Sequence, residues 1–436
     1  MTQSYNAPKG TSDLLGASAR GWDYLQETAR KVFTRYGYES IYTPIFEQTE
    51  VFVRGIGEAT DVVGKEMYTF EDRGGRSITL RPENTAGVVR AAIQAHLTDN
   101  GASAKLFYAG PMFRYERPQK GRQRQFYQIG AEALGQTSPL ADAEMIMMLW
   151  DYFTTLGLKP VNMRLLVNSM GDEVCRPAYR EKLSNYIASK TTELCDDCAR
   201  RADTNPLRAF DCKKESCIDV MEGAPRIADE LCGECQVHNE AVLRLLDAAN
   251  LKYELDPTLV RGLDYYTRTV FEVQVDHGLG SQNAIGGGGR YDGLFQDLGG
   301  KPTPCIGFAL GAERTLLALE AEGVDVGVSD ELLVYLANVT EEQREAAFTL
   351  ACELRGRGVA AVSDLQSRSL KSQFKQADKL GARYVLVIGE EEQQRGGVTI
   401  RDMETKEERF VTLGSIFKML TKVKENDHNA RQQILN

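Results

Sequence analysis

The sequence predicts an α+β protein with a helical insertion and a smaller C-terminal α/β domain. Hairpin and antiparallel strand signals dominate the first 325 residues, so we expect an antiparallel sheet flanked by helices there. Residues 171–253 are cysteine-rich, charged and without strand alternation, which indicates a helical insertion. At 436 residues the chain is too long for one domain, and we divide it at 1–170, 171–253, 254–325 and 330–425.

The elements of the antiparallel part follow from apolar spacing and from turn residues. Leu25, Ala29, Val32 and Phe33 recur at helical spacing, which predicts a helix over 22–36 that Gly37 can end. Alternating apolar and polar residues and turn signals predict the other elements. These are a strand at 40–44, hairpin strands at 67–70 and 77–80, helices at 85–96 and 140–156, and strands at 161–168 and 267–275.

In the last hundred residues the pattern changes, and β-rich segments alternate with helical ones. Strands are predicted at 332–336, 359–362 and 384–388, with helices at 341–355 and 369–380. This order predicts a separate domain with a mostly parallel sheet. Lys371, Lys375 and Lys379 recur every four residues and form one basic stripe on the second helix. Such a stripe is either a solvated face or a surface for RNA.

Composition narrows the function classes. The chain is 42% hydrophobic and 26% charged, which is typical of a globular protein. No apolar run is long enough to cross a bilayer and the N-terminus lacks the apolar core of a signal peptide, so we expect a cytoplasmic protein without a membrane contact. The net charge of −10 argues against a general nucleic-acid coat but allows a local basic surface.

The most informative local feature is the basic loop, residues 114–124, which joins two strand-like segments. It holds five Arg or Lys and one Glu inside an acidic chain, and such a loop can bind phosphates from several directions. On the strand that follows, Gln128, Gly130 and Glu132 are two residues apart and therefore share one face. An amide, a gap and a carboxylate suit a small polar ligand better than a core.

Several segments resemble the class II aminoacyl-tRNA synthetases. Phe113 and Arg114 with the basic loop look like motif 2, residues 307–314 look like motif 3, and the helix and strand ending at Pro44 look like motif 1, a dimer-interface element. The specific signal is residues 259–267, Leu-Val-Arg-Gly-Leu-Asp-Tyr-Tyr-Thr, which is similar to a signature of bacterial histidyl-tRNA synthetases. The resemblance runs from about residue 8 to about 420 and implies the class II fold, an anticodon-binding C-terminal domain and a homodimer.

The resemblance implies a two-step reaction. Histidine and ATP would give histidyl-adenylate and pyrophosphate, and the histidyl group would then pass to tRNA(His). By the family's motifs Arg114 should hold the α-phosphate, Arg314 the γ-phosphate, and Arg261 the α-phosphate and the substrate carboxylate. Mg²⁺ should bridge the outer phosphates of ATP. Residues 286–289 are four glycines, and they would either let backbone pass close to the ligand or form a loop.

The resemblance also implies a pocket for the amino acid. Glu83, Thr85 and Gln128 match the positions that receive the α-amino group, and Glu132 and Tyr266 match those that read the imidazole. Gly130 would leave room for the ring between them. Tyr265 is also assigned to this pocket, although strand alternation would place one of the two adjacent tyrosines in a structural role. The residues matching the contact to the tRNA acceptor end are Arg117, Gln119, Lys120 and Arg122.

Two questions stay open at this point. Cys195 and Cys198 form one C-x-x-C pair and Cys232 and Cys235 another, with Cys212 and Cys217 between them. Their spacing fits structural zinc or free thiols, and we assign no residue as a metal ligand. The alternatives to a ligase are a catalytically silent relative that senses histidine, and an adenylating enzyme that uses no tRNA.

Overall fold

In the computed structural model, residues 5–57, 60, 62–280, 283–324, 326 and 333–421 are described. The chain separates into two compact units, residues 1–327 and 328–436. The predicted boundary near 325–330 falls mostly outside the described residues, and the finer division of the first unit stays a prediction. Within the described part of the chain, no helix is long and apolar enough to cross a membrane.

The first unit is built on an eight-stranded sheet, and most of its strand pairs are antiparallel, as predicted. Its strands in spatial order are β1 (Glu39–Ser40), β5 (Ala104–Phe113), β6 (Gln125–Leu134), β11 (Cys305–Gly311), β10 (Ala284–Arg290), β9 (Thr267–Val275), β7 (Met163–Ser169) and β8 (Glu254–Leu255). The short edge strands β1 and β8 pair in parallel with their neighbours. The strand predicted at 40–44 is therefore shorter and starts earlier than expected.

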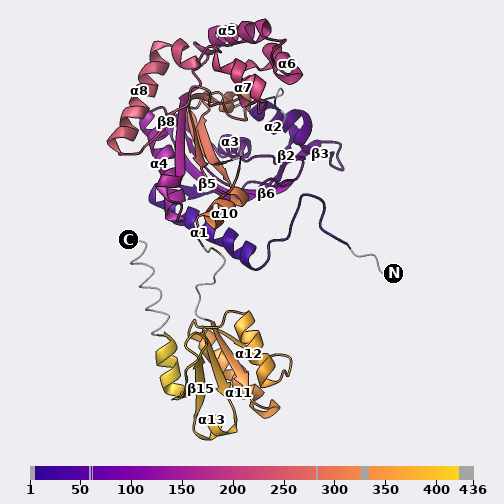
Figure 1. The fold of residues 1–436 in the computed structure, drawn as a ribbon, viewed down its shortest axis with the longest axis vertical. Coiled ribbons are helices and arrows are strands. Elements are labelled where there is room, and N and C mark those ends of the chain that lie inside the picture. Colours follow the sequence, from indigo (N-terminus) through magenta and orange to yellow (C-terminus); the bar gives the residue numbers. More distant parts are fainter. Residues whose placement is uncertain are drawn as a thin grey trace. The chain divides into compact units, whose positions relative to one another are not determined.

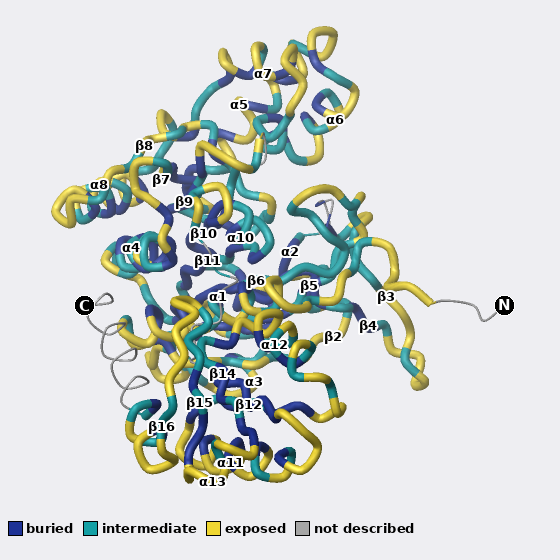
Figure 2. Tube along the Cα trace, turned by 60° about the horizontal axis from the view of Figure 1, so that its bottom comes forward, coloured by how far each residue is buried: buried dark blue, intermediate teal, exposed yellow. Residues whose placement is uncertain are grey.

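Helices cover both faces of this sheet. One face packs against α1 (Ala17–Arg35), α4 (Pro139–Thr155) and α8 (Gly233–Ala248) around a core that includes Phe33, Leu149 and Phe271. The other face carries α3 (Thr85–Gln94) and α9 (Leu294–Asp297). A small sheet of β2 (Phe46–Gln48), β4 (Ser77–Leu80) and β3 (Tyr68–Glu71) lies beside α2 (Thr49–Ile56). Figure 2 shows that central strands of the large sheet such as β10 and β11 are mostly buried.

The insertion, residues 171–253, is helical, as predicted. It contains α5 (Arg176–Ser189), α6 (Asp196–Thr204), a 3₁₀ segment (Pro206–Asp211), α7 (Glu215–Glu222), a second 3₁₀ segment (Ile227–Glu230) and α8. Figure 1 shows α5, α6 and α7 grouped together at one end of the first unit. These elements have their own small apolar core around Tyr179, Leu183 and Ile187.

The second unit holds a five-stranded sheet in the order β13 (Ala360–Ser363), β12 (Leu333–Asn338), β14 (Tyr384–Ile388), β15 (Gly397–Asp402) and β16 (Glu408–Thr412). Its helices include α11 (Arg344–Gly356), α12 (Leu370–Lys379), α13 (Glu390–Gln394) and a helix that begins at residue 413. The three predicted strands pair in parallel, but β15 and β16 add an antiparallel hairpin. The expectation of a mostly parallel sheet is therefore wrong for this half of the sheet.

Candidate active site

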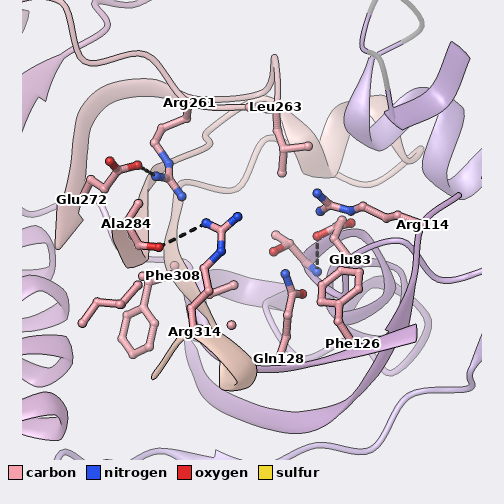
Figure 3. A pocket seen from close by; sticks show the side chains of 18 of the residues that line it. Glu83, Arg114, Phe126, Gln128, Arg261, Leu263, Glu272, Ala284, Phe308 and Arg314 are labelled. Atoms are coloured by element: carbon pink, nitrogen blue, oxygen red, sulfur yellow. Dashed lines mark hydrogen bonds and ion pairs between the residues drawn. The ribbon is translucent and has the colours of Figure 1, made fainter. Parts of the chain in front are cut away.

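A cavity of ≈ 260 Å³ opens beside the large sheet, on the face that carries α3 and α9. Its walls come from segments far apart in the sequence: the connection between β4 and α3, strand β6, the basic loop, residues 261–266, and the start of α10 (Ala312–Ala321). Residues 259–267, the signature loop, supply Arg261 and the tyrosines Tyr265 and Tyr266 to this lining. Figure 3 shows how the polar side chains of these segments point into one space.

Strand β10 forms part of the cavity wall, and four of its seven residues, 286–289, have no side chain. The four glycines lie in a strand in the middle of the sheet, which excludes the alternative of a loop, and the backbone of Gly286 and Gly287 lines the cavity. A Cβ on Gly287 would lie 3.0 Å from Arg261 Nη1, and a Cβ on Gly288 would overlap the carbonyl oxygen of Gly307. On β11, a Cβ on Gly307 would overlap the Glu132 carboxylate. Glycine is thus required for the packing of these strands and of the side chains above them.

Three guanidinium groups converge on the cavity. Arg114 follows β5, donates from Nε to the Pro82 carbonyl oxygen at 2.9 Å, and stacks 5.4 Å from the Phe126 ring centroid. Arg261 forms an ion pair with Glu272 of β9. Arg314, in the first turn of α10, donates to the Ala284 carbonyl oxygen at 3.2 Å. The structure therefore brings together the three arginines predicted to act on ATP (Figure 3).

The surroundings shift the pKa values of Arg314 and Arg261 in opposite directions. Burial lowers the pKa of Arg314, and the nearby charge of Arg122 lowers it further, so an anion entering the cavity would relieve this repulsion. Burial also opposes the charge of Arg261, but the Glu272 carboxylate together with Tyr266 and Tyr265 outweighs burial, and the pKa of Arg261 is raised. Glu272 was not predicted as a site residue, although its place on the polar face of β9 indicated that it points away from the core.

Glu132 is fully buried at the inner end of the cavity. It accepts hydrogen bonds from Thr85 Oγ1 at 2.8 Å and from the Tyr291 hydroxyl at 2.5 Å, and Tyr108 Oη lies 3.5 Å away. Burial raises the pKa of Glu132 to about 8, against the lowering effect of these hydrogen bonds. The carboxyl group is therefore mostly protonated at neutral pH in the unliganded protein. Tyr108 and Tyr291 were not predicted as part of this site.

Glu83, Thr85 and Gln128 lie in the same cavity, as their predicted roles require. Glu83 also has a structural role, because its two oxygens accept from the backbone N–H groups of Thr85 at 2.6 Å and Ala86 at 3.0 Å at the start of α3. Gln128 Oε1 is buried and has no hydrogen-bond partner among the described residues. A buried acceptor without a partner is costly, so Gln128 is poised to receive a donor from a ligand.

Both tyrosines assigned to the pocket line the cavity, whereas the space expected at Gly130 is not there. Tyr265 and Tyr266 both line the cavity, with ring centroids 4.7 Å apart, because they precede β9 in a turn where strand alternation does not apply. The gap predicted at Gly130 is filled: a Cβ there would overlap the Tyr108 side chain, which comes from the neighbouring strand β5. Gly130 therefore makes room for Tyr108 rather than directly for a ligand.

The basic loop divides into two parts. Arg122 lines the cavity and pairs with Glu116 through Nε and Oε2 at 2.8 Å. Arg117, Gln119 and Lys120 are exposed and do not line the cavity. The structure thus separates Arg122 from the other three residues predicted to contact tRNA.

Three residues of the insertion donate hydrogen bonds to the signature loop, a role that the sequence did not indicate. Arg176 Nη1 donates to the Tyr266 carbonyl oxygen at 2.8 Å, and Asn205 Nδ2 donates to Asp264 Oδ1 at 2.9 Å. Arg208 donates to the Gly262 carbonyl oxygen. The conformation of the loop that carries Arg261 therefore depends on the insertion.

Comparisons with known proteins agree with this arrangement. A family model described as histidyl-tRNA synthetase matches residues 10–315, and one described as an anticodon-binding domain matches residues 333–423. A histidine–tRNA ligase of Halothermothrix orenii is 49% identical over 417 residues, which are 96% of this chain and 99% of that protein. A histidine–tRNA ligase of Desulfitobacterium hafniense is 48% identical over 423 residues, 97% of this chain and 99% of that protein.

Solved structures of proteins titled as histidyl-tRNA synthetases also match the chain. The apo histidyl-tRNA synthetase of Staphylococcus aureus matches with a TM-score of 0.80 and 38% identity, over 96% of this chain and 100% of that chain. A protein from Bacillus halodurans, titled as an ATP phosphoribosyltransferase regulatory subunit/histidyl-tRNA synthetase, matches with a TM-score of 0.62 and 19% identity over 89% of this chain and 99% of that chain. At that identity the second likeness concerns the fold alone.

Proposed function

The chain belongs to the histidyl-tRNA synthetase family, and we propose that the cavity lined by Arg114, Arg261 and Arg314 is where it activates histidine. As a histidine–tRNA ligase it uses ATP to attach histidine to tRNA(His) through a histidyl-adenylate. The observation that supports this site is the convergence of three guanidinium groups on one cavity, next to a polar pocket.

The arginines have complementary roles in the proposed first step. The histidine carboxylate attacks the α-phosphorus of ATP, and Arg114 and Arg261 stabilise the charge that develops on the phosphate oxygens. Arg314 holds the γ-phosphate, so that pyrophosphate leaves in a fixed direction. Arg261 is suited to this task because Glu272 and the glycine strand beneath it fix its guanidinium before ATP arrives.

The inner part of the cavity is the proposed histidine pocket. Glu83, Thr85 and Gln128 offer acceptors to the α-amino group, and the buried Gln128 oxygen lacks any other partner among the described residues. Glu132 accepts the imidazole N–H, while Tyr266 meets the other end of the ring. A pocket of this kind rejects isosteres by about 10⁴-fold, because its own polar groups would stay unpaired.

We also propose that Mg²⁺ enters with ATP as the counter-ion of its outer phosphates. Carboxylates are the protein ligands that this ion prefers, and Glu116 and Glu313 both line the cavity. The charge of Glu116 raises the pKa of Arg314, and the charge of Arg314 lowers the pKa of Glu313, so both carboxylates lie near the arginine proposed to hold the γ-phosphate. Burial raises the pKa of Glu313 to about 7, so a bound cation would favour its ionised form.

The second step needs the acceptor end of tRNA(His) at the mouth of the same cavity. Arg117, Gln119 and Lys120 are exposed on the basic loop and are free of the cavity wall, which suits contacts to phosphates. Arg122, paired with Glu116, links this loop to the ATP site. Affinity for tRNA should therefore fall as the salt concentration rises.

We further propose a homodimer that works in the cytoplasm. Tyr42, Ile45 and Phe46 are 78%, 45% and 54% exposed within or beside the segment that resembles motif 1. Large apolar side chains grouped on a surface mark an interface, and a second copy of the chain would cover them. Light scattering on the purified protein measures this directly.

The proposed site is tested by replacing Arg261. We expect Arg261→Ala to reduce histidine-dependent pyrophosphate exchange by about 10³-fold or more, since it removes a fixed charge beside the developing anion. Arg164→Ala is the control, because this arginine pairs with Glu254 away from the cavity and should leave exchange near normal. Thermal melting of both variants checks that they are folded.

The outcome separates the competing functions as well. Near-normal exchange by folded Arg261→Ala would refute its role. A wild-type protein without histidine-dependent exchange would favour the silent relative, and exchange without charging of tRNA(His) would favour an adenylating enzyme that uses no tRNA.

A further inference from the structure

Seven of the nine cysteines gather in two clusters within or beside the insertion. The distal cluster consists of Cys195, Cys198, Cys212 and Cys217, and the basal cluster of Asp172, Cys175, Cys232 and Cys235. In each cluster the four ligand atoms lie within 4.8 Å of one another. The two C-x-x-C pairs therefore belong to two different clusters.

The distal cluster joins three elements of the insertion. Cys195 precedes α6 and Cys198 lies in its first turn, Cys212 ends the 3₁₀ segment, and Cys217 lies in α7. Cys198 and Cys217 are fully buried, and the backbone N–H of Cys195 donates to Cys217 Sγ at 3.2 Å. A C-x-x-C pair with backbone N–H groups directed at cysteine sulfur is suited to thiolates, which are poorly stabilised in an apolar core without a cation.

The basal cluster joins the start of the insertion to the start of its last helix, α8. Asp172 and Cys175 lie just after β7, while Cys232 and Cys235 lie at the start of α8. The sulfur atoms of Cys175 and Cys235 are 3.8 Å apart, much longer than the roughly 2.05 Å of a disulfide. Two sulfurs bound at about 2.3 Å to one tetrahedral Zn²⁺ stand about 3.8 Å apart.

The fourth ligand of the basal cluster is held in place by its surroundings. Asp172 Oδ1 lies 3.7 Å from Cys232 Sγ, and its Oδ2 pairs with Arg268 Nη2 at 3.3 Å. The backbone N–H of Asp172 donates to Cys175 Sγ at 3.2 Å. Metal ligands are commonly oriented by such outer contacts.

We propose that the insertion binds two structural Zn²⁺ ions, one in the Cys₄ distal cluster and one in the Cys₃Asp basal cluster. Thiolate ligands in fours select zinc among the common divalent cations, and a carboxylate can replace one of them. Neither set leaves a position for a substrate, so both ions stabilise structure rather than take part in catalysis.

The basal ion has a consequence for the active site, which rests on the function proposed above. It fixes the segment next to Arg176, whose guanidinium holds the Tyr266 carbonyl oxygen, and the distal ion fixes the elements around Asn205 and Arg208, which hold Asp264 and Gly262. Loss of either ion should loosen the signature loop and raise the KM for histidine several-fold. The metal content itself does not depend on whether the proposed function is correct.

The test measures metal in the whole protein, purified with a reductant and without added zinc. Inductively coupled plasma mass spectrometry should find about two Zn²⁺ per chain. The variants Cys198→Ser/Cys217→Ser and Cys232→Ser/Cys235→Ser should each retain about one. Cys305→Ser, at a buried cysteine outside both clusters, and Cys352→Ser, at an exposed one in the second unit, should retain the wild-type content.

A second measurement covers variants that fail to fold. Titrating wild-type protein with a mercurial reagent should release about two Zn²⁺ in step with the modification of the cluster thiols. Wild-type zinc below about a tenth of an equivalent, or iron in its place, would overturn both sites. Zinc that stays unchanged in one double variant would overturn the site which that variant removes.

Discussion

Glu132 is an acidic residue in a place where water cannot solvate its ionised form. Two hydroxyl groups donate to it, yet burial outweighs them and leaves its pKa at about 8. Below that pH the empty protein keeps the proton, and above it the carboxylate forms. A ligand that needs an acceptor at this position must therefore displace a proton at neutral pH.

We expect histidine binding at pH 7 to release close to one proton, since imidazole N–H donation favours the ionised carboxyl group of Glu132. Titration calorimetry in two buffers with different ionisation enthalpies measures this proton. Between pH 6.5 and 8 the affinity should rise with pH, by at most about tenfold per unit, and level off above the pKa. Glu132→Gln should bind histidine more weakly and release no proton, while its affinity for ATP stays near normal. Wild-type binding without proton release, or equal losses for both substrates, would place the imidazole elsewhere.

The residues of the site were predictable to the extent that each lies in a local pattern. Gln128 and Glu132 follow from alternation on one strand, and the three arginines follow from short motifs. Tyr108 and Tyr291 could not be found this way, because each reaches Glu132 from another strand or from the end of one. Only the strand order brings them together.

Among the elements, β10 shows where sequence patterns lose information. A strand is recognised by side chains that alternate between two faces, and residues 286–289 have none. Their absence is nevertheless what lets β10 pack closely against β11, because a Cβ on Gly288 would overlap the carbonyl oxygen of Gly307. The helices α1 and α4, in contrast, were predictable because their apolar faces are long and regular.

We expect Gly288→Ala to destabilise the first unit by about 3 kcal/mol, because two central strands must move apart to accept the methyl group. The corresponding drop in the midpoint of thermal unfolding is about 6 °C or more. Gly311→Ala is the matched control at the end of β11: an added Cβ there meets nothing within 4 Å, and φ is −92°. Circular dichroism without ligands measures both, and equal midpoints for the two variants would mean that β10 and β11 can separate at little cost.

At the scale of the whole molecule, an acidic chain has to bind an acidic partner. The net charge is −10, so affinity for tRNA must come from local basic surfaces, for which the basic loop and the stripe on α12 are the candidates. Lys371, Lys375 and Lys379 are all exposed on that helix. The α/β character of the second unit was predictable from the alternation of strands and helices. Strand β15 was missed, although the alternating apolar residues Val398 and Ile400 indicate a strand there.

Because the two units have separate cores, activation and tRNA binding should be separable. We expect the triple variant Lys371→Ala/Lys375→Ala/Lys379→Ala to raise the KM for tRNA(His) by about tenfold and to weaken its salt dependence, since three phosphate contacts are lost. Histidine-dependent pyrophosphate exchange should stay unchanged, because the residues that line the cavity belong to the first unit, whereas the stripe belongs to the second. Lys418→Ala, at an exposed lysine of helix 413–421 in the same unit, is the control. An unchanged KM and salt dependence in the triple variant would identify the stripe as a solvated face and leave the basic loop as the main contact.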